Sequence, residues 1–247
     1  MQTSKNLGRI TILVAIVALT AAVLLSACGK GEKKPLSYYN SEGEKLLSSG
    51  NNEGARKLMA EAVANYPHDA AAHFILGRVY IELNQNDLAL AEFNSAIGID
   101  ANMAPAFAGR GLVFKNTGRM TEALRDYDQA LSTDPKLILA LVGKGSVLRE
   151  MKRYGDALAV VDKAIGFEPD NADLYYNKGN IYLSSGKYED ALPLYDKALM
   201  LKPNLYQVYI NKASALAHLK RDAEAAEDYR KAHQLNPSFE PPDWAKK

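Results

Sequence analysis

The strongest constraint on the fold of this chain is a glycine that recurs at one fixed interval. The glycines are Gly43, Gly77, Gly111, Gly145 and Gly179. Alanine keeps the same interval in two further registers, which start at Ala55 and Ala62 and run without insertion or deletion. A fixed period of the length from Gly43 to Gly77 predicts a chain that stacks copies of one supersecondary unit. It also favours a surface that holds another protein over an enzyme with a pocket.

Each unit is predicted to contain two helices. In the fifth unit the helices are expected over residues 172–185 and 188–201, separated by a Gly-Lys turn. Tyr175, Gly179 and Tyr182 fall on one face of the first helix, because their spacing follows the helical period. Gly179 is small where the partner helix must approach closely. Pro203 cannot continue the second helix and ends the unit.

These helix–turn–helix units resemble tetratricopeptide repeats in their spacing and in the residue types that recur. The resemblance implies an all-α fold, a right-handed superhelical solenoid of six repeats. The units are expected at 36–69, 70–103, 104–137, 138–171, 172–205 and 206–239, followed by a tail at 240–247. The departures are mild: Ala101 lacks the proline of other units, and Ala213 replaces the glycine.

The residues at the two ends of the array predict where the stack stops. Lys45 stands where units two to five have valine or isoleucine. Asp222, Ala226 and His233 replace the larger apolar residues of earlier second helices. Terminal repeats need polar outer faces for solubility. Trp244 is expected to fold back over the last helix, with contact to a partner as the alternative.

The N-terminus predicts export and lipid anchoring. An apolar run over residues 10–25 is too short to span a bilayer comfortably and suits an export signal. It ends in a Leu-Ser-Ala-Cys tetrad that resembles the lipobox of bacterial lipoproteins. The resemblance implies a signal peptide at 1–27, lipidation of Cys28 and a linker at 28–35. The alternative is an uncleaved signal anchor with an incidental cysteine.

The linker would hold the repeats close to the membrane. The eight chain steps from Cys28 to Leu36 reach roughly 27 Å at most. Lys30, Lys33 and Lys34 are interpreted as part of a solvated linker, with contact to anionic headgroups as the alternative. Gly29 follows the cysteine, and a residue other than aspartate there resembles outer-membrane lipoproteins. We therefore expect a periplasm-facing protein of the cell envelope, at the outer membrane rather than the inner one.

Composition and motifs argue against several functions. With 30 basic and 29 acidic residues, the chain has no dominant affinity for nucleic acid. The single cysteine cannot form an intramolecular disulfide. The histidines are isolated, without metal-ligand spacing, and the glycines fall at repeat positions rather than in a phosphate loop. The sequence predicts no catalytic residues, metal, cofactor or small-molecule substrate.

A basic and an acidic register run in parallel through the units. The basic one is Arg110, Lys144, Lys178 and Lys212, and the acidic one is Asp128, Asp162 and Asp196. Each aspartate precedes the lysine of the next unit by the same interval. The simplest interpretation is a set of salt bridges between units, Asp128–Lys144, Asp162–Lys178 and Asp196–Lys212. The alternative is a stripe that binds phosphates or an acidic partner.

The resemblance places ligands on the concave face made by the first helices. The candidate binding residues are Phe74, Arg78, Leu112, Lys115, Val142, Arg149, Tyr176, Asn177, Asn180 and Asn211, with Ile81, Leu139 and Ile210 on the same face. Apolar, aromatic and basic residues in this mixture suit an amphipathic or extended peptide. The asparagines can hydrogen-bond a bound main chain. The alternatives are a groove without ligand and a groove closed by the tail.

The predicted function is a membrane-anchored scaffold or adaptor of the cell envelope that binds a partner peptide or helix. Similar architectures suggest a pilotin-like assembly factor for a type IV pilus or secretion pore, a regulatory adaptor for peptidoglycan hydrolases, or a component of outer-membrane protein or exopolysaccharide machinery. Glycan binding is another class, for which Phe74 and Tyr176 are the candidate aromatics. The lysine–asparagine clamp of chaperone co-factors is not reproduced, because Asn40 and Glu44 lack its positive charge.

Overall fold

The computed structural model describes residues 33–245. The predicted signal peptide and the lipidation residue Cys28 lie outside the described residues. Between residues 33 and 245 the chain forms twelve α-helices and one short 3-10 helix, with no strand. No helix in this range is long and apolar enough to cross a membrane. The predicted all-α class is confirmed.

The helices form six consecutive pairs, one for each predicted unit. They are α2 (Leu36–Ser48) and α3 (Asn52–Asn65), α4 (Ala70–Glu82) and α5 (Asn86–Ile99), α6 (Ala104–Asn116) and α7 (Met120–Thr133), α8 (Ile138–Glu150) and α9 (Tyr154–Phe167), α10 (Ala172–Ser184) and α11 (Tyr188–Leu201), and α12 (Tyr206–His218) and α13 (Asp222–Leu235). The helices predicted in the fifth unit are confirmed to within one residue.

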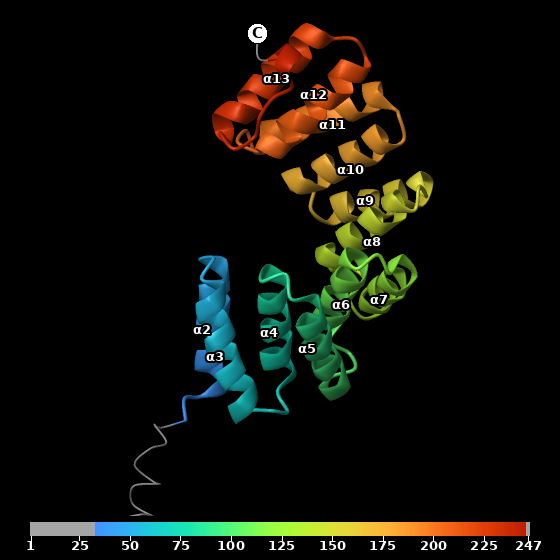
Figure 1. Cartoon of the computed structure of the whole chain (residues 1–247). Helices are drawn as coiled ribbons and strands as arrows, with labels where there is room; N and C mark the ends of the chain where they lie inside the picture. The colour runs from blue at the N-terminus through green and yellow to red at the C-terminus, as the bar shows by residue number, and fades with distance from the viewer. Residues whose placement is uncertain (1–32, 246–247) are drawn as a thin grey trace, which may run out of the picture.

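The pairs stack into an open arc, the superhelical solenoid that the repeat predicts (Figure 1). Each first helix contacts the second helix of its own unit and the first helix of the next unit. Among the described helices, no second helix contacts another second helix. First helices are therefore closer together than second helices, so α2, α4, α6, α8, α10 and α12 line the inside of the arc.

A buried apolar side chain of each second helix fills the space over the small residue of its partner helix. In the fifth unit Tyr195 is fully buried, and its ring lies directly over Gly179. In the sixth unit Ala213 carries the methyl group that glycine lacks, and the corresponding Tyr229 keeps 9% of its surface exposed. The glycine period thus marks the closest approach of the two helices in each unit.

The turns inside the units repeat with the same period as the glycines in the helices. One residue in each turn has a positive φ angle, namely Gly50, Asn84, Gly118, Lys152, Gly186 and Lys220. Glycine adopts this left-handed conformation without a steric cost, whereas lysine does not. Lys152 and Lys220 hold it with φ angles of 60° and 63° because the repeat geometry requires the same turn in every unit.

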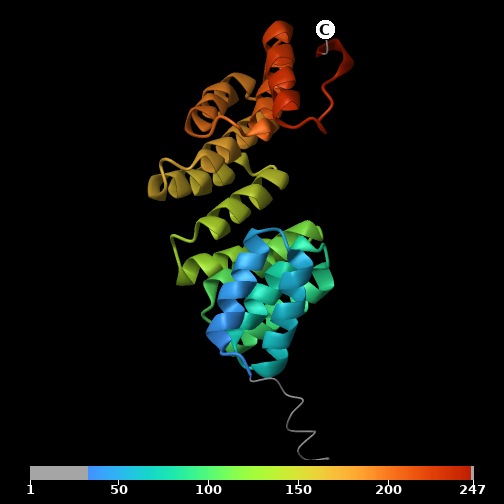
Figure 2. The ribbon, with the colours of Figure 1, turned by 90° about the vertical axis from the view of Figure 1, so that its left-hand side faces the viewer.

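The two ends of the stack differ in how they are closed. At the first unit the Lys45 side chain is 74% exposed, as its position predicts. At the last unit the chain turns back beside α13 (Figure 2) and ends in the 3-10 helix η1 (Asp243–Ala245). The Trp244 ring meets Tyr229 edge-on at 5.9 Å between centroids, and Ala245 is fully buried. The predicted folding back of the tail is confirmed.

Candidate partner-binding face

The inner face of the arc is the candidate site, and the six first helices carry its side chains. The predicted residues recur at positions two, five, nine and twelve of a unit, which lie on one side of a helix because of the helical period, and Asn177 and Asn211 lie beside them. Side chains at neighbouring positions instead enter the core: Ile75, Val113 and Leu148 are at most 4% exposed. The inner face divides into three parts with different chemistry.

The first part has no net charge, because its arginine is paired. The Arg78 guanidinium donates from Nη1 to Oε1 of Glu44, one unit earlier. The same guanidinium lies 5.6 Å from the centre of the Phe74 ring and makes a cation–π contact with it. Phe74 in turn packs against Phe93 of the second helix. This part is therefore a fixed, neutral surface.

The central part combines leucines and cations. Leu112 and Lys115 of α6 are half-buried, and Lys115 has no ion-pair partner among residues 33–245. Leu139 of α8 is 49% exposed. Val142 packs partly against the core, and Arg149 donates to Oγ of Ser184 at 3.2 Å. This part offers apolar area beside an unpaired positive charge.

The third part is a polar network that sequence reasoning did not predict. The Asn180 Oδ1 accepts hydrogen bonds from the Tyr195 hydroxyl at 2.9 Å and from Asn211 Nδ2 at 2.7 Å. Asn211 Nδ2 also donates to the Tyr176 hydroxyl oxygen at 3.1 Å. Burial raises the pKa of Tyr195 well above its ordinary value, so its hydroxyl stays a proton donor.

The network changes what the asparagines can offer a ligand. Because two donors hold the Asn180 Oδ1, its amide Nδ2 is directed elsewhere, and no acceptor within residues 33–245 bonds to it. Asn177 donates from Nδ2 to the main-chain oxygen of Asp173 at 2.7 Å. Of the three predicted amides, Asn180 therefore keeps its donor for a ligand, whereas the amide nitrogens of Asn177 and Asn211 have partners within the protein.

The basic register is a structural feature, as the simplest interpretation predicts. The three predicted salt bridges form, with Nζ to Oδ1 distances of 2.6 Å for Lys144–Asp128, 2.7 Å for Lys178–Asp162 and 2.8 Å for Lys212–Asp196. Arg110 differs, because Asn94 stands where the earlier aspartate would be. It donates to Asn94 Oδ1 at 2.8 Å and makes a two-pronged contact with Asp126 at 2.7 and 2.8 Å. These cations are therefore occupied.

Three of the four histidines also have structural partners. His73 is buried between Glu92, 2.6 Å from its Nδ1, and the Pro67 carbonyl oxygen, 3.1 Å from its Nε2. His218 stacks on Tyr188 with ring centroids 4.4 Å apart. The His233 Nδ1 lies 2.7 Å from the Phe239 carbonyl oxygen and helps to hold the returning tail. Within residues 33–245 no three His, Cys, Asp or Glu side chains gather as a metal site would require.

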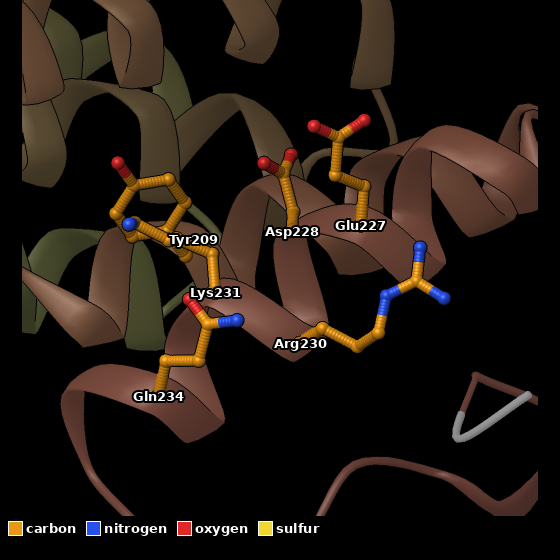
Figure 3. Close-up of a pocket in the computed structure, with 6 residues that line it drawn as sticks. All are labelled: Tyr209, Glu227, Asp228, Arg230, Lys231 and Gln234. Atoms are coloured by element: carbon orange, nitrogen blue, oxygen red, sulfur yellow. The ribbon is translucent and has the colours of Figure 1, made fainter.

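A surface pocket of about 420 Å³ lies on the last helix pair (Figure 3), and none of its lining residues is an inner-face candidate. Its lining consists of Tyr209 of α12 and five residues of α13, namely Glu227, Asp228, Arg230, Lys231 and Gln234. Figure 3 shows two carboxylates and two basic side chains around it, which leaves no dominant sign of charge. One edge is also fixed by Lys212, whose Nζ lies 3.6 Å from Asp228. We therefore retain the inner face as the candidate site.

Comparison with known proteins agrees with the architecture. Models of the tetratricopeptide repeat match residues 41–104, 104–137, 172–205 and 206–239, and a TPR repeat model matches residues 145–184. Together these matches span most of the described chain. No curated protein sequence matches the chain.

Several solved structures are similar in fold. PilF of Pseudomonas aeruginosa is 19% identical, with a TM-score of 0.68 over 83% of this chain and 93% of that one. A tetratricopeptide repeat protein from Parabacteroides merdae is 18% identical, with a TM-score of 0.69 over 81% and 78% of the two chains. YrrB, described as a TPR protein with an unusual peptide-binding site, is 20% identical, with a TM-score of 0.54 over 76% and 95%. At these identities the likeness shows the fold alone.

Proposed function

The chain belongs to the tetratricopeptide repeat family, and from this premise we propose that its inner face binds a peptide or helix of a partner protein. The protein acts as an interaction scaffold. The partner lies along the first helices, with its apolar side chains on Leu112 and Leu139 and its main chain near Asn180. Apolar contacts of this kind give affinity, and the few directed polar groups set the register of the bound segment.

The proposal rests on an unpaired cation and an exposed leucine in the central part of the inner face. Lys115 has no ion-pair partner within the described residues, although neighbouring cations of the first helices are engaged with Glu44, Ser184 or Asp128. Leu139 is half exposed in the same part. A cation without a counter-ion, in the same part as the half-buried Leu112 and the half-exposed Leu139, matches an amphipathic segment that carries a carboxylate.

The lipid anchor is a second component of the proposal. Lipidation of Cys28 holds the scaffold at a membrane of the cell envelope, facing the periplasm and at the outer membrane rather than the inner one. A shared membrane raises the effective concentration of the groove for membrane-bound partners without any new contact. Labelling of cells with a palmitate analogue tests the anchor, because the label is expected on the wild-type protein and absent from Cys28→Ala. An equally labelled variant would refute it.

The groove is tested by a pull-down from membranes with a Leu112→Glu/Lys115→Glu double variant. Within the described residues, neither side chain forms a hydrogen bond or belongs to a buried cluster, so the fold should tolerate both changes. Leu88→Glu is the matched control, because Leu88 is 48% exposed on a second helix. The double variant is expected to lose a partner that wild type and control retain. Retention of every partner by the double variant would contradict the proposal.

A further inference from the structure

Two lysines and two tyrosines fasten the start of the described chain to the base of the first unit. The Lys33 ammonium lies 4.0 Å from the centre of the Tyr66 ring and donates to the main-chain oxygen of Asn65. The Lys34 ammonium lies 4.4 Å from the centre of the Tyr38 ring and donates to its hydroxyl at 3.2 Å. The Tyr66 hydroxyl donates back to the Lys34 carbonyl oxygen at 2.8 Å. We call Lys33, Lys34, Tyr38 and Tyr66 the Lys–Tyr clasp.

The clasp is continuous with the core of the first unit. Tyr39 is fully buried, and its ring meets Tyr38 edge-on at 5.8 Å and Tyr66 edge-on at 6.2 Å. Its hydroxyl donates to Glu61 Oε1 at 2.6 Å. The chain therefore leaves the solenoid at a fixed point. Both lysines remain exposed to solvent, and both pack on tyrosine rings.

The distance from this exit point to the proposed anchor is short. Four residues separate Lys33 from Cys28. Five chain steps reach about 18 Å at most, even when fully extended. A lipidated Cys28 lies at the headgroup layer, which is roughly 6 Å thick in each leaflet. The anchor therefore keeps the clasp close to the headgroups.

We propose that the Lys–Tyr clasp is a membrane-facing surface that lies on anionic phospholipid headgroups, an inference that rests on the lipidation of Cys28 proposed above. Tyrosine side chains favour the boundary between headgroups and hydrocarbon, because the ring is apolar while the hydroxyl can contact water. Each lysine near an anionic surface favours the docked state by about fivefold. The field of that surface fades over roughly 8–10 Å at physiological salt, so the lysines act only when the first unit is docked.

Docking of the clasp sets the orientation of the whole scaffold. The first and last units lie at opposite ends of the arc, as Figures 1 and 2 show. With the clasp on the bilayer, α13 and Trp244 are directed away from it, and the inner face runs outward from the membrane. A partner segment then enters the groove from the periplasmic side rather than from within the lipid layer.

The test measures how close each end of the protein lies to the headgroups. Mature protein is coupled through Cys28, its sole cysteine, to a maleimide phospholipid. The vesicles contain equal parts of phosphatidylcholine and phosphatidylglycerol, with a spin-labelled headgroup lipid that quenches nearby tryptophan. Tyr38→Trp in a Trp244→Phe background reports on the clasp, and the wild-type protein reports on Trp244. Tyr175→Trp in the same background is the matched control, since Lys197 lies 5.8 Å from the Tyr175 ring centre in the fifth unit.

We expect strong quenching at position 38 and none above the background at positions 175 and 244. Adding Lys33→Gln and Lys34→Gln should lower the docked fraction, because each lysine contributes about fivefold to the ratio of docked to undocked protein. Pure phosphatidylcholine vesicles should have a similar effect. Equal quenching at all three positions, or none at position 38, overturns the proposal.

The chemical coupling separates this test from the fate of the anchor in cells. A gel shift shows that Cys28 carries the lipid before quenching is measured. An unquenched tryptophan at position 38 would therefore refute docking by the clasp and would leave the proposed lipidation in cells unaffected. Absence of palmitate label on the wild-type protein in cells would instead refute the lipidation of Cys28. The two failures therefore have different readouts.

Discussion

The Tyr195 ring lies so close to Gly179 that a Cβ built on residue 179 would stand 2.6 Å from the ring atom Cε1. Tyr195 cannot move away easily, because it is fully buried and its hydroxyl is held by Asn180. The contact joins the core of the fifth unit to the polar network of the inner face. The most regular position of the repeat therefore also positions a residue of the candidate site.

Gly179→Ala should destabilise the protein. The added methyl group must displace the Tyr195 ring, and overpacking of this kind typically costs about 1–3 kcal/mol. Gly166→Ala in α9 is the matched control, because a Cβ there meets nothing within 4 Å and alanine in a helix gains up to about 1 kcal/mol over glycine. Urea denaturation followed by circular dichroism measures both changes. Equal effects of the two substitutions would show that close packing does not explain the glycine period.

Lys152→Gly should stabilise the protein. Lys152 has a φ of 60° in the turn between α8 and α9, where an L-residue costs roughly 1–2 kcal/mol and glycine has no steric cost. We expect a gain of about 1 kcal/mol in the free energy of unfolding. Gly118→Ala, at the same turn position in the third unit, should have the opposite sign. A loss of stability in Lys152→Gly would show that the lysine side chain has a compensating role.

Arg110→Ala should cost more stability than Lys178→Ala, although both residues belong to one register. Asp126 has only 9% of its side chain exposed and loses its two-pronged partner, which typically costs about 3 kcal/mol for a buried charge. Asp162 is 52% exposed, so the loss of Lys178 should cost less than about 1 kcal/mol. Denaturation at low and high salt measures both variants. Equal costs would mean that burial does not distinguish the two pairs.

Asp228→Asn should make the protein more stable at neutral pH. Burial raises the pKa of the Asp228 carboxyl above its ordinary value, although Lys212 opposes this shift. The native protein then binds more protons than the unfolded chain, so the stability that this carboxyl contributes at low pH is lost as the pH rises through the native pKa. Lys212 keeps its salt bridge with Asp196 in the variant.

The stability difference between wild type and Asp228→Asn should therefore disappear below about pH 4, where the carboxyl is protonated in both states. Urea midpoints across the acidic range measure this difference. A variant that is less stable than wild type at neutral pH would show that the attraction between Lys212 and Asp228 outweighs the burial of the carboxylate.

Sequence reasoning predicted the features that depend on the period itself. The helix pairs follow from the period, because every unit repeats the close contact of its two helices at a small residue and the turns that end those helices. The salt bridge between Lys178 and Asp162 also follows, since the constant spacing of aspartate and lysine links one unit to the next. Such features are set by the backbone, which the repeat specifies.

Features that depend on individual neighbours could not be predicted in this way. Asn180 and Asn211 were expected to bind a ligand main chain, but they bond to each other because the curvature of the stack brings adjacent first helices within reach. The clasp depends on the contact of Tyr66 with Lys34, which lies outside the period. The left-handed turn could have been predicted in part, since glycine occupies its positive-φ position in every second unit. Lys152 occupies the same position in a unit between two of these, and lysine does not indicate such a turn.

Partner binding on the inner face is tested by site-specific photo-crosslinking in cells that make the protein. A photoreactive residue at position 112 lies on the inner face, and the same residue at position 88 lies on a second helix. We expect a discrete partner adduct from position 112 that disappears when Lys115→Glu is added, and no such adduct from position 88. An adduct of equal yield from position 88, or none from position 112, would contradict partner binding on the inner face.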